Sequence, residues 1–135
     1  MNKIFLRFTI KGDDLSVFDM LNDISVKADV YEKGRIYSNA FGGKSSPQST
    51  NRWVYSLESR QNESLNCMLK RMYKDLRPSL ERLVTYTKKY YSLLDIVIYV
   101  DDCEQKSMFN VNFSKESLKI ISKLNSKTSL TFVDF

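Results

Sequence analysis

The chain has 135 residues, with 21 lysines and arginines against 16 aspartates and glutamates, a net charge of +5 and no histidine. The missing histidine excludes Ser-His-Asp and Cys-His catalytic systems and zinc sites with histidine ligands. The length fits one domain, residues 1–135, and a hydrophobic share of 42% supplies its core. No run of about 18 apolar residues occurs, and Arg7 interrupts the apolar N-terminus. We therefore expect a cytoplasmic protein with neither a membrane span nor a secretory signal.

The first third of the chain predicts a strand, a helix and a weaker strand. Residues 3–11 alternate between apolar and polar side chains, which is typical of a strand with one buried face. Asp13 is suited to cap the helix that follows. The apolar face expected for this helix consists of Leu15, Phe18 and Leu21. Residues 26–31 form the weaker strand candidate, and residues 34–51 have the composition of a loop.

The middle of the chain predicts a strand and two helices. Residues 52–58 alternate again, with Trp53 expected in the core. An apolar stripe at helical spacing covers residues 63–76. Pro78 interrupts this stripe, because proline lacks a backbone donor and disfavours helix at the preceding residue. We therefore expect a second helix over residues 78–89.

The last third predicts three strands and one helix. Residues 93–100 alternate clearly, and residues 108–113 and 130–133 are shorter strand candidates. Ser114 is suited to cap a helix between the two shorter strands. The inward face expected for this helix consists of Leu118, Ile121 and Leu124. The resulting order, β-α-β-β-α-α-β-β-α-β, predicts an α+β fold with helices packed on a largely antiparallel sheet.

The residue types that carry chemistry occur without the spacing that catalysis or metal binding requires. The two cysteines are far apart, and the acidic neighbours of Cys103 disfavour a thiolate. Both pairs of adjacent aspartates sit at expected turns, where capping and turn formation account for them. Asp101, Asp102 and Glu104 lack the spacing of a calcium-binding loop. We therefore expect no enzyme, no catalytic or metal-binding residues and no cofactor.

Positive charge is concentrated in residues 41–92, which carry ten basic and four acidic side chains. A basic patch on the expected central helices consists of Lys70, Arg71, Lys74 and Arg77. Three of these, all except Arg71, follow the i, i+4, i+7 spacing of one helix face, and tyrosines interleave with them. Cations with aromatic side chains suit a phosphate backbone with stacked bases. An acidic protein partner would use the same patch.

Several short motifs resemble a known family in their order and spacing. They are Gly12-Asp13-Asp14-Leu15, Gly34, the segment Trp53 to Ser59, Leu76-Arg77-Pro78, the segment Phe113 to Leu118, Leu124, and the segment Leu130 to Phe135. Together they resemble the bacterial domain-of-unknown-function family 4279 over almost the whole chain. The chain departs from the family pattern at Ala28-Asp29, where Pro-Thr is common, and at Phe135, where tyrosine is common.

The resemblance implies a small α+β domain similar to those encoded beside bacterial toxins as immunity proteins. We therefore expect a non-catalytic binding protein with a cognate protein toxin as partner, and a nucleic-acid-associated module as the alternative. The net charge of +5 suits a toxin with an acidic surface. For a basic toxin, the acidic contact surface would be Asp95, Asp101, Asp102 and Glu104. Arg52 and Tyr55 are expected at the docking rim, because arginine and tyrosine are common in interface hot spots.

Overall fold

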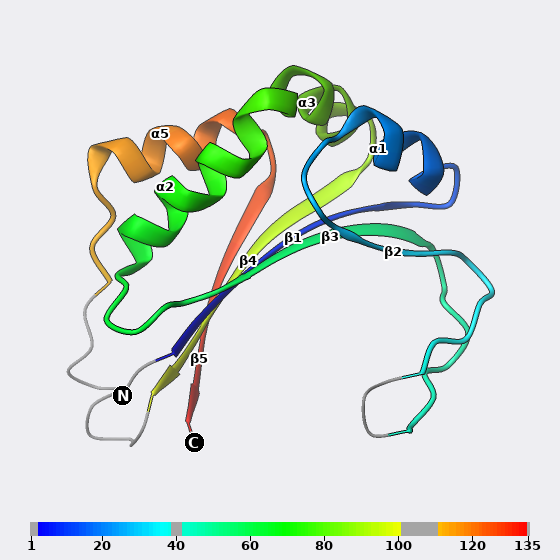
Figure 1. The fold of residues 1–135 in the computed structure, drawn as a ribbon, viewed down its shortest axis with the longest axis horizontal. Coiled ribbons are helices and arrows are strands. Elements are labelled where there is room, and N and C mark those ends of the chain that lie inside the picture. The colour runs from blue at the N-terminus through cyan, green and yellow to red at the C-terminus, as the bar shows by residue number, and fades with distance from the viewer. Residues whose placement is uncertain (1–2, 39–41, 101–110, 135) are drawn as a thin grey trace.

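One five-stranded sheet organises the computed structural model, which describes residues 3–38, 42–100 and 111–134. The strands are β1 (Lys3–Gly12), β2 (Asp29–Tyr31), β3 (Asn51–Glu58), β4 (Tyr91–Val100) and β5 (Lys127–Asp134). Their order is β2-β3-β1-β4-β5, with β4 and β5 parallel and the other neighbouring pairs antiparallel. The predicted α+β class and the largely antiparallel sheet are confirmed (Figure 1).

The helices of the described residues lie together on one side of this sheet (Figure 1). They are α1 (Val17–Asp23), α2 (Leu65–Leu76), α3 (Leu80–Lys89) and α5 (Lys115–Lys123). A 3-10 turn, Arg77–Ser79, separates α2 from α3 and contains the proline that predicted this break. Three helices begin at serine caps whose hydroxyls accept a backbone N–H: Ser16, Ser64 and Ser114. No helix in the described ranges is long and apolar enough to cross a membrane.

The inward face of α1 differs from the expected one. The cap is Ser16 rather than Asp13, so the helix begins later than the sequence pattern indicated. Its buried residues are Val17 and Met20. Phe18 and Leu21, both expected inside, are 61% and 42% exposed. Because each residue turns a helix by about 100°, the shifted start presents a different set of side chains to the core.

The last third of the chain departs from expectation at two places. The predicted cap of α5, Ser114, is confirmed, but the helix buries Ser117 and Ile120 and leaves Leu118 53% exposed. The small Ser117 side chain is buried there because its hydroxyl bonds to Asn66 of α2. The strand expected over residues 108–113 lies mostly outside the described residues, and residues 111–113 have no regular secondary structure.

The core lies between the helices and one face of the sheet. Alternate residues of the two central strands are buried there, among them Leu6, Phe8, Ile10, Leu94, Ile96 and Ile98. Trp53 of β3 is 0% exposed and meets Phe8 edge to face, with ring centroids 6.2 Å apart. The expected core position of Trp53 is therefore confirmed. The intervening residues of each strand point to the opposite face, away from the helices.

Candidate functional site

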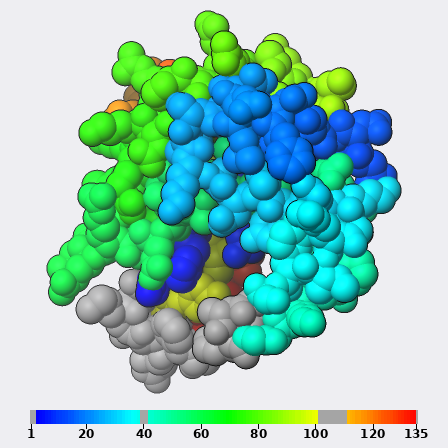
Figure 2. All heavy atoms as spheres, turned by 45° about the vertical axis from the view of Figure 1, so that its right-hand side comes forward, coloured from blue at the N-terminus to red at the C-terminus, as the bar shows by residue number. Residues whose placement is uncertain are grey.

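The helix-free face of the sheet is the candidate site. The sheet arches so that this face is concave (Figure 1), and Figure 2 shows a hollow with β1 in dark blue and β4 in yellow at its floor. Its central strands supply Phe5, Arg7, Thr9, Lys11, Leu93, Asp95, Val97 and Tyr99. These side chains are exposed or half-buried, in contrast with the buried residues between them. The face therefore offers both charge and apolar surface to a binding partner.

Cations and tyrosine rings gather at one end of this face. Lys11 of β1 and Arg52 of β3 are directly opposite each other across the antiparallel pair. The Arg52 guanidinium lies 4.6 Å from the centre of the Tyr31 ring. The ammonium groups of Lys11 and Lys127 lie 4.8 and 5.1 Å from the centre of the Tyr91 ring. We call these five residues the cation–tyrosine cluster, which strands β1 to β5 build together.

The middle and the other end of the face are less cationic. Arg7 lies opposite Asp95 of β4, and the Asp95 carboxylate accepts a hydrogen bond of 2.7 Å from the Ser129 hydroxyl. At the far end, Lys3 forms an ion pair with Glu58, and the Phe5 and Tyr99 rings meet edge to face at 5.4 Å. Positive and negative side chains balance each other at these positions, and among the described residues of this face the excess of positive charge lies in the cation–tyrosine cluster.

Two of the residues expected at a partner surface, Arg52 and Asp95, lie on this face. Tyr55 does not, because it points into the core, is 3% exposed and donates its hydroxyl to the Asp75 carboxylate at 2.7 Å. Burial and this hydrogen bond raise the pKa of the Tyr55 phenol well above its usual value. The structure thus corrects the expected place of Tyr55 at a docking rim. It is two residues from Trp53, so both lie on the same side of β3.

The remaining acidic residues of the expected contact surface, Asp101, Asp102 and Glu104, lie outside the described residues. Asp95 is therefore the member of that set that the structure places. It is half-buried at the centre of the open face, where Arg7 and Ser129 surround it. The described carboxylates of this region form no extended acidic surface of their own.

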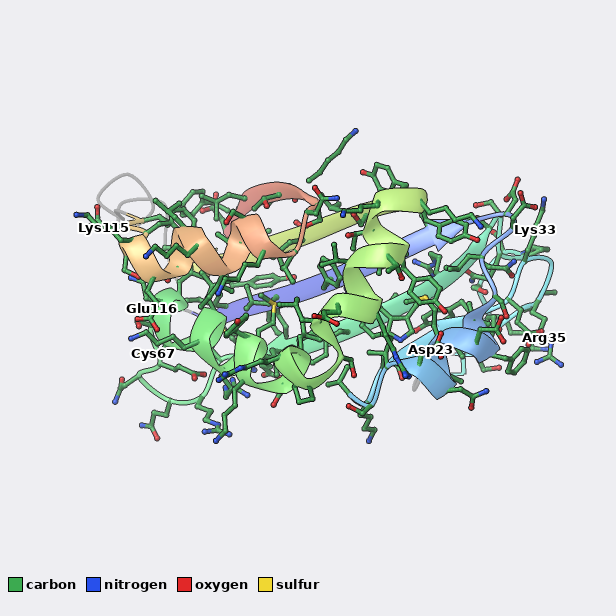
Figure 3. All side chains as sticks on the ribbon, turned by 90° about the horizontal axis from the view of Figure 1, so that it is seen from above. Asp23, Lys33, Arg35, Cys67, Lys115 and Glu116 are labelled. Carbon is green, nitrogen blue, oxygen red and sulfur yellow. The ribbon has the colours of Figure 1, made fainter. Side chains whose placement is uncertain are left out.

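The expected basic patch is partly neutralised by neighbouring carboxylates. Lys70 forms an ion pair of 3.2 Å with Glu116, which lies at the beginning of α5 beside α2 (Figure 3). Arg71 donates to both oxygens of Glu63, at 3.1 and 2.7 Å, and also to the backbone carbonyl of residue 58. This pairing lowers the pKa of Glu63. Of the four patch residues, Lys74 and Arg77 remain exposed with no ion pair to the described residues.

The cation–tyrosine cluster itself was not predicted from the sequence. The alternation of residues 3–11 places Lys11 on the outer face of its strand, and the alternation of residues 52–58 does the same for Arg52. Their meeting depends on the pairing of β1 with β3, and Tyr91 and Lys127 enter through β4 and β5. A local sequence pattern does not show which strands will be neighbours in the sheet. The sequence could therefore place Lys11 and Arg52 on the outer faces of their strands, but it could not show that they lie side by side.

The open face carries groups that can bind a partner. It presents ammonium and guanidinium groups, phenol rings and hydroxyls, which recognise anionic and polar surfaces. Within residues 3–38, 42–100 and 111–134, no three histidine, cysteine, aspartate or glutamate side chains are grouped as metal ligands would be. Cys67 is an exposed free thiol on α2, on the helix side of the molecule.

A family model described as a domain of unknown function, DUF4279, matches residues 2–133. No curated protein and no solved structure matches the chain.

Proposed function

We propose that this chain, which belongs to the DUF4279 family, is a non-catalytic binding protein that neutralises a cognate protein toxin by direct contact. The observation that carries the proposal is the concave sheet face left open by the helices (Figure 1). A rigid layer of helices supports this face from behind, which keeps the contact residues pre-positioned. Stoichiometric neutralisation requires such a surface and needs no catalytic group.

The residue types on the open face support a protein partner. Arginine and tyrosine are enriched among interface residues that contribute most to affinity, and the face presents Arg7, Arg52, Tyr31 and Tyr91. Apolar side chains lie among them at its centre, where Val97 and Leu93 are half-buried. A mixed surface of this kind matches the apolar core and polar rim of protein interfaces.

The alternative function, a nucleic-acid-associated module, is less well supported. It relied on the basic central helices, where Lys70 and Arg71 are paired with carboxylates. Paired cations attract phosphate less strongly than free ones, since the neighbouring carboxylate repels it. Lys74, Arg77, Lys88 and Lys89 of these helices stay exposed, but the exposed carboxylates of Asp75 and Glu81 lie among them and weaken their attraction for a polynucleotide.

Co-expression with the product of the adjacent gene tests the proposal. We expect the chain to restore growth of cells that express the neighbouring protein and to co-purify with it in a one-to-one complex. A non-toxic neighbour, or one that forms no complex with this chain, would contradict the proposal.

A matched pair of threonine variants locates the contact. Thr9→Arg places a bulky side chain at the centre of the open face, where Thr9 is half-buried opposite Val54 and Leu93. Thr85→Arg makes the same change at an exposed position of α3. We expect Thr9→Arg to weaken the complex at least about tenfold and Thr85→Arg to leave it unchanged. Equal affinities for the two variants would move the contact off this face.

A further inference from the structure

We infer that the partner presents acidic side chains to the cation–tyrosine cluster formed by Lys11, Arg52, Lys127, Tyr31 and Tyr91. This inference rests on the proposed function, because it assigns the chemistry of the partner that the open face receives. It adds a defined docking point and a defined partner charge to that function.

The first step of the argument is the placement of like charges. Lys11 and Arg52 are directly opposite in the β1–β3 register, and like charges at opposed positions of a sheet repel each other. Lys127 adds a third cation, since it shares the Tyr91 ring with Lys11. Within the described ranges, none of the three cations forms an ion pair with a carboxylate. An incoming anion would relieve this repulsion.

The second step is the way in which the cations are held. Arg52 lies over the Tyr31 ring and donates from Nη2 to the Gln48 side chain at 2.9 Å. The two lysines are held over Tyr91 in the same manner. Side chains already held in place lose less conformational entropy on binding, so the cluster is organised before the partner arrives.

The third step separates an acidic protein from a nucleic acid. Guanidinium and ammonium groups already lie over the Tyr31 and Tyr91 rings, which leaves those ring faces less open to stacked bases. The same sheet face also carries the carboxylates of Asp29 and Asp95. These would repel a continuous phosphate backbone, whereas a protein can place single acidic side chains at the cluster and neutral ones elsewhere.

The fourth step is the shape of the surface beside the cluster. A hollow of about 480 Å³ lies on the helix side of Tyr91 and Lys127, where Thr87 of α3 and Ile121 and Ser122 of α5 line it together with residues 125 and 126. The Ser126 hydroxyl is buried and has no hydrogen-bond partner among the described residues. The hollow is therefore not part of the open face, and its hydroxyl donor would be reached only by a partner group that extends around the ends of β4 and β5 beside Tyr91 and Lys127.

Two charge-matched variants test the inference. In the first, Lys11, Arg52 and Lys127 are changed to glutamine. In the second, Lys74, Arg77 and Lys119 on the helix side are changed to glutamine, so both variants lose the same charge. The probes are a labelled polyglutamate peptide and a thymidine oligonucleotide of equal net charge, measured at low salt by fluorescence anisotropy. We expect the first variant to bind the peptide at least about tenfold more weakly than wild type, and the second to stay within about twofold.

Three outcomes would overturn the inference. Equal loss in both variants would mean that net charge alone binds the peptide. Tighter binding of wild type to the oligonucleotide than to the peptide would indicate a nucleic-acid surface. Full binding of the adjacent gene product by the first variant would remove the cluster from the interface while leaving the proposed function intact. Conversely, a harmless neighbouring protein would defeat the proposed function even if the cluster binds the peptide.

Discussion

Two tyrosine hydroxyls donate to carboxylates, one between the sheet and a helix and the other between two helices. Tyr55 of β3 donates to Asp75 of α2 at 2.7 Å, and Tyr86 of α3 donates to Asp23 of α1 at 2.6 Å. Both bonds join residues far apart in the sequence, and each has a charged acceptor, which strengthens a hydrogen bond. They stabilise the support behind the open face and do not lie on that face.

Replacement of Tyr55 by phenylalanine tests this separation of stability from binding. The variant keeps the buried ring and loses the hydrogen bond to Asp75. We expect the free energy of unfolding to fall by about 1 to 2 kcal/mol, as measured by urea denaturation. Affinity for the adjacent gene product should stay at the wild-type value. A large loss of affinity with unchanged stability would return Tyr55 to the contact surface.

A second prediction concerns how Tyr86 affects the stability of the protein at alkaline pH. Burial and the hydrogen bond to Asp23 raise the pKa of Tyr86 to about 12, from an ordinary value of 10.0. Between these values the unfolded chain loses the phenolic proton while the folded chain keeps it. The stability that Tyr86 contributes is therefore fully present below about pH 10 and is lost as the pH rises towards 12.

Urea denaturation at a series of pH values measures this effect. We expect the stability difference between wild type and Tyr86→Phe to be constant up to about pH 10 and to shrink above it. Lysines and the other tyrosines titrate in both proteins, so they largely cancel from the difference. A difference that stays constant up to pH 12 would mean that the folded state does not retain this proton.

At the scale of elements, one asparagine fastens α5 to α2. The Asn66 side chain donates to the backbone carbonyl of Asn112 at 2.9 Å and accepts from the Ser114 backbone and the Ser117 hydroxyl, at 3.1 and 2.6 Å. We expect Asn66→Ala to lower the free energy of unfolding by about 2 to 3 kcal/mol, because it leaves the buried Ser117 with fewer partners. Cys67→Ala, at the exposed neighbouring position, should change it by less than about 0.5 kcal/mol.

Amide hydrogen exchange distinguishes a local effect from a general one. If Asn66 holds α5 in place, the Asn66→Ala variant should lose protection first in α5, while β1 and β4 exchange as in wild type. Uniform loss across the sheet would indicate that the substitution weakens the whole fold and does not act through α5.

The elements themselves were largely readable from the sequence, and their contacts were not. β1 and β4 follow from alternation, and the break between α2 and α3 follows from Pro78. The face of α1 was missed because the helix begins at Ser16, three residues after the predicted cap Asp13. A cap three residues later changes which residues of the segment are helical and which of them face the core.

The candidate site was less predictable than the fold, because it depends on strand neighbours. Arg52 was expected at a partner surface, but Lys11, Tyr91 and Lys127 were not connected with it until the sheet order placed them on one face. For Arg71 the error was the opposite one, because the sequence predicted a cation without an ion pair and the structure shows a paired one. Its bond to Glu63 spans eight positions and a helix boundary, so helical spacing gave no indication of it.

At the scale of the whole molecule, the net charge of +5 is carried in part by like charges that face each other. This arrangement makes the stability of the free protein depend on salt. Dissolved ions screen the repulsion between Lys11 and Arg52, since the screening length falls from about 10 Å at 0.1 M to about 3 Å at 1 M salt. Lys11→Gln removes the repulsion, whereas Lys27→Gln removes an exposed cation from the segment between α1 and β2.

We expect sodium chloride to stabilise wild type more than Lys11→Gln, by about 0.5 kcal/mol between low salt and 1 M, as judged from urea unfolding. The Lys27→Gln variant should show the same salt response as wild type, although its net charge equals that of Lys11→Gln. Comparing responses to salt, and not absolute stabilities, largely cancels the loss of the contact between Lys11 and the Tyr91 ring. Identical responses in all three proteins would mean that the opposed cations do not repel each other measurably. In that case the free protein would contain no repulsion between Lys11 and Arg52 that an acidic partner could reduce.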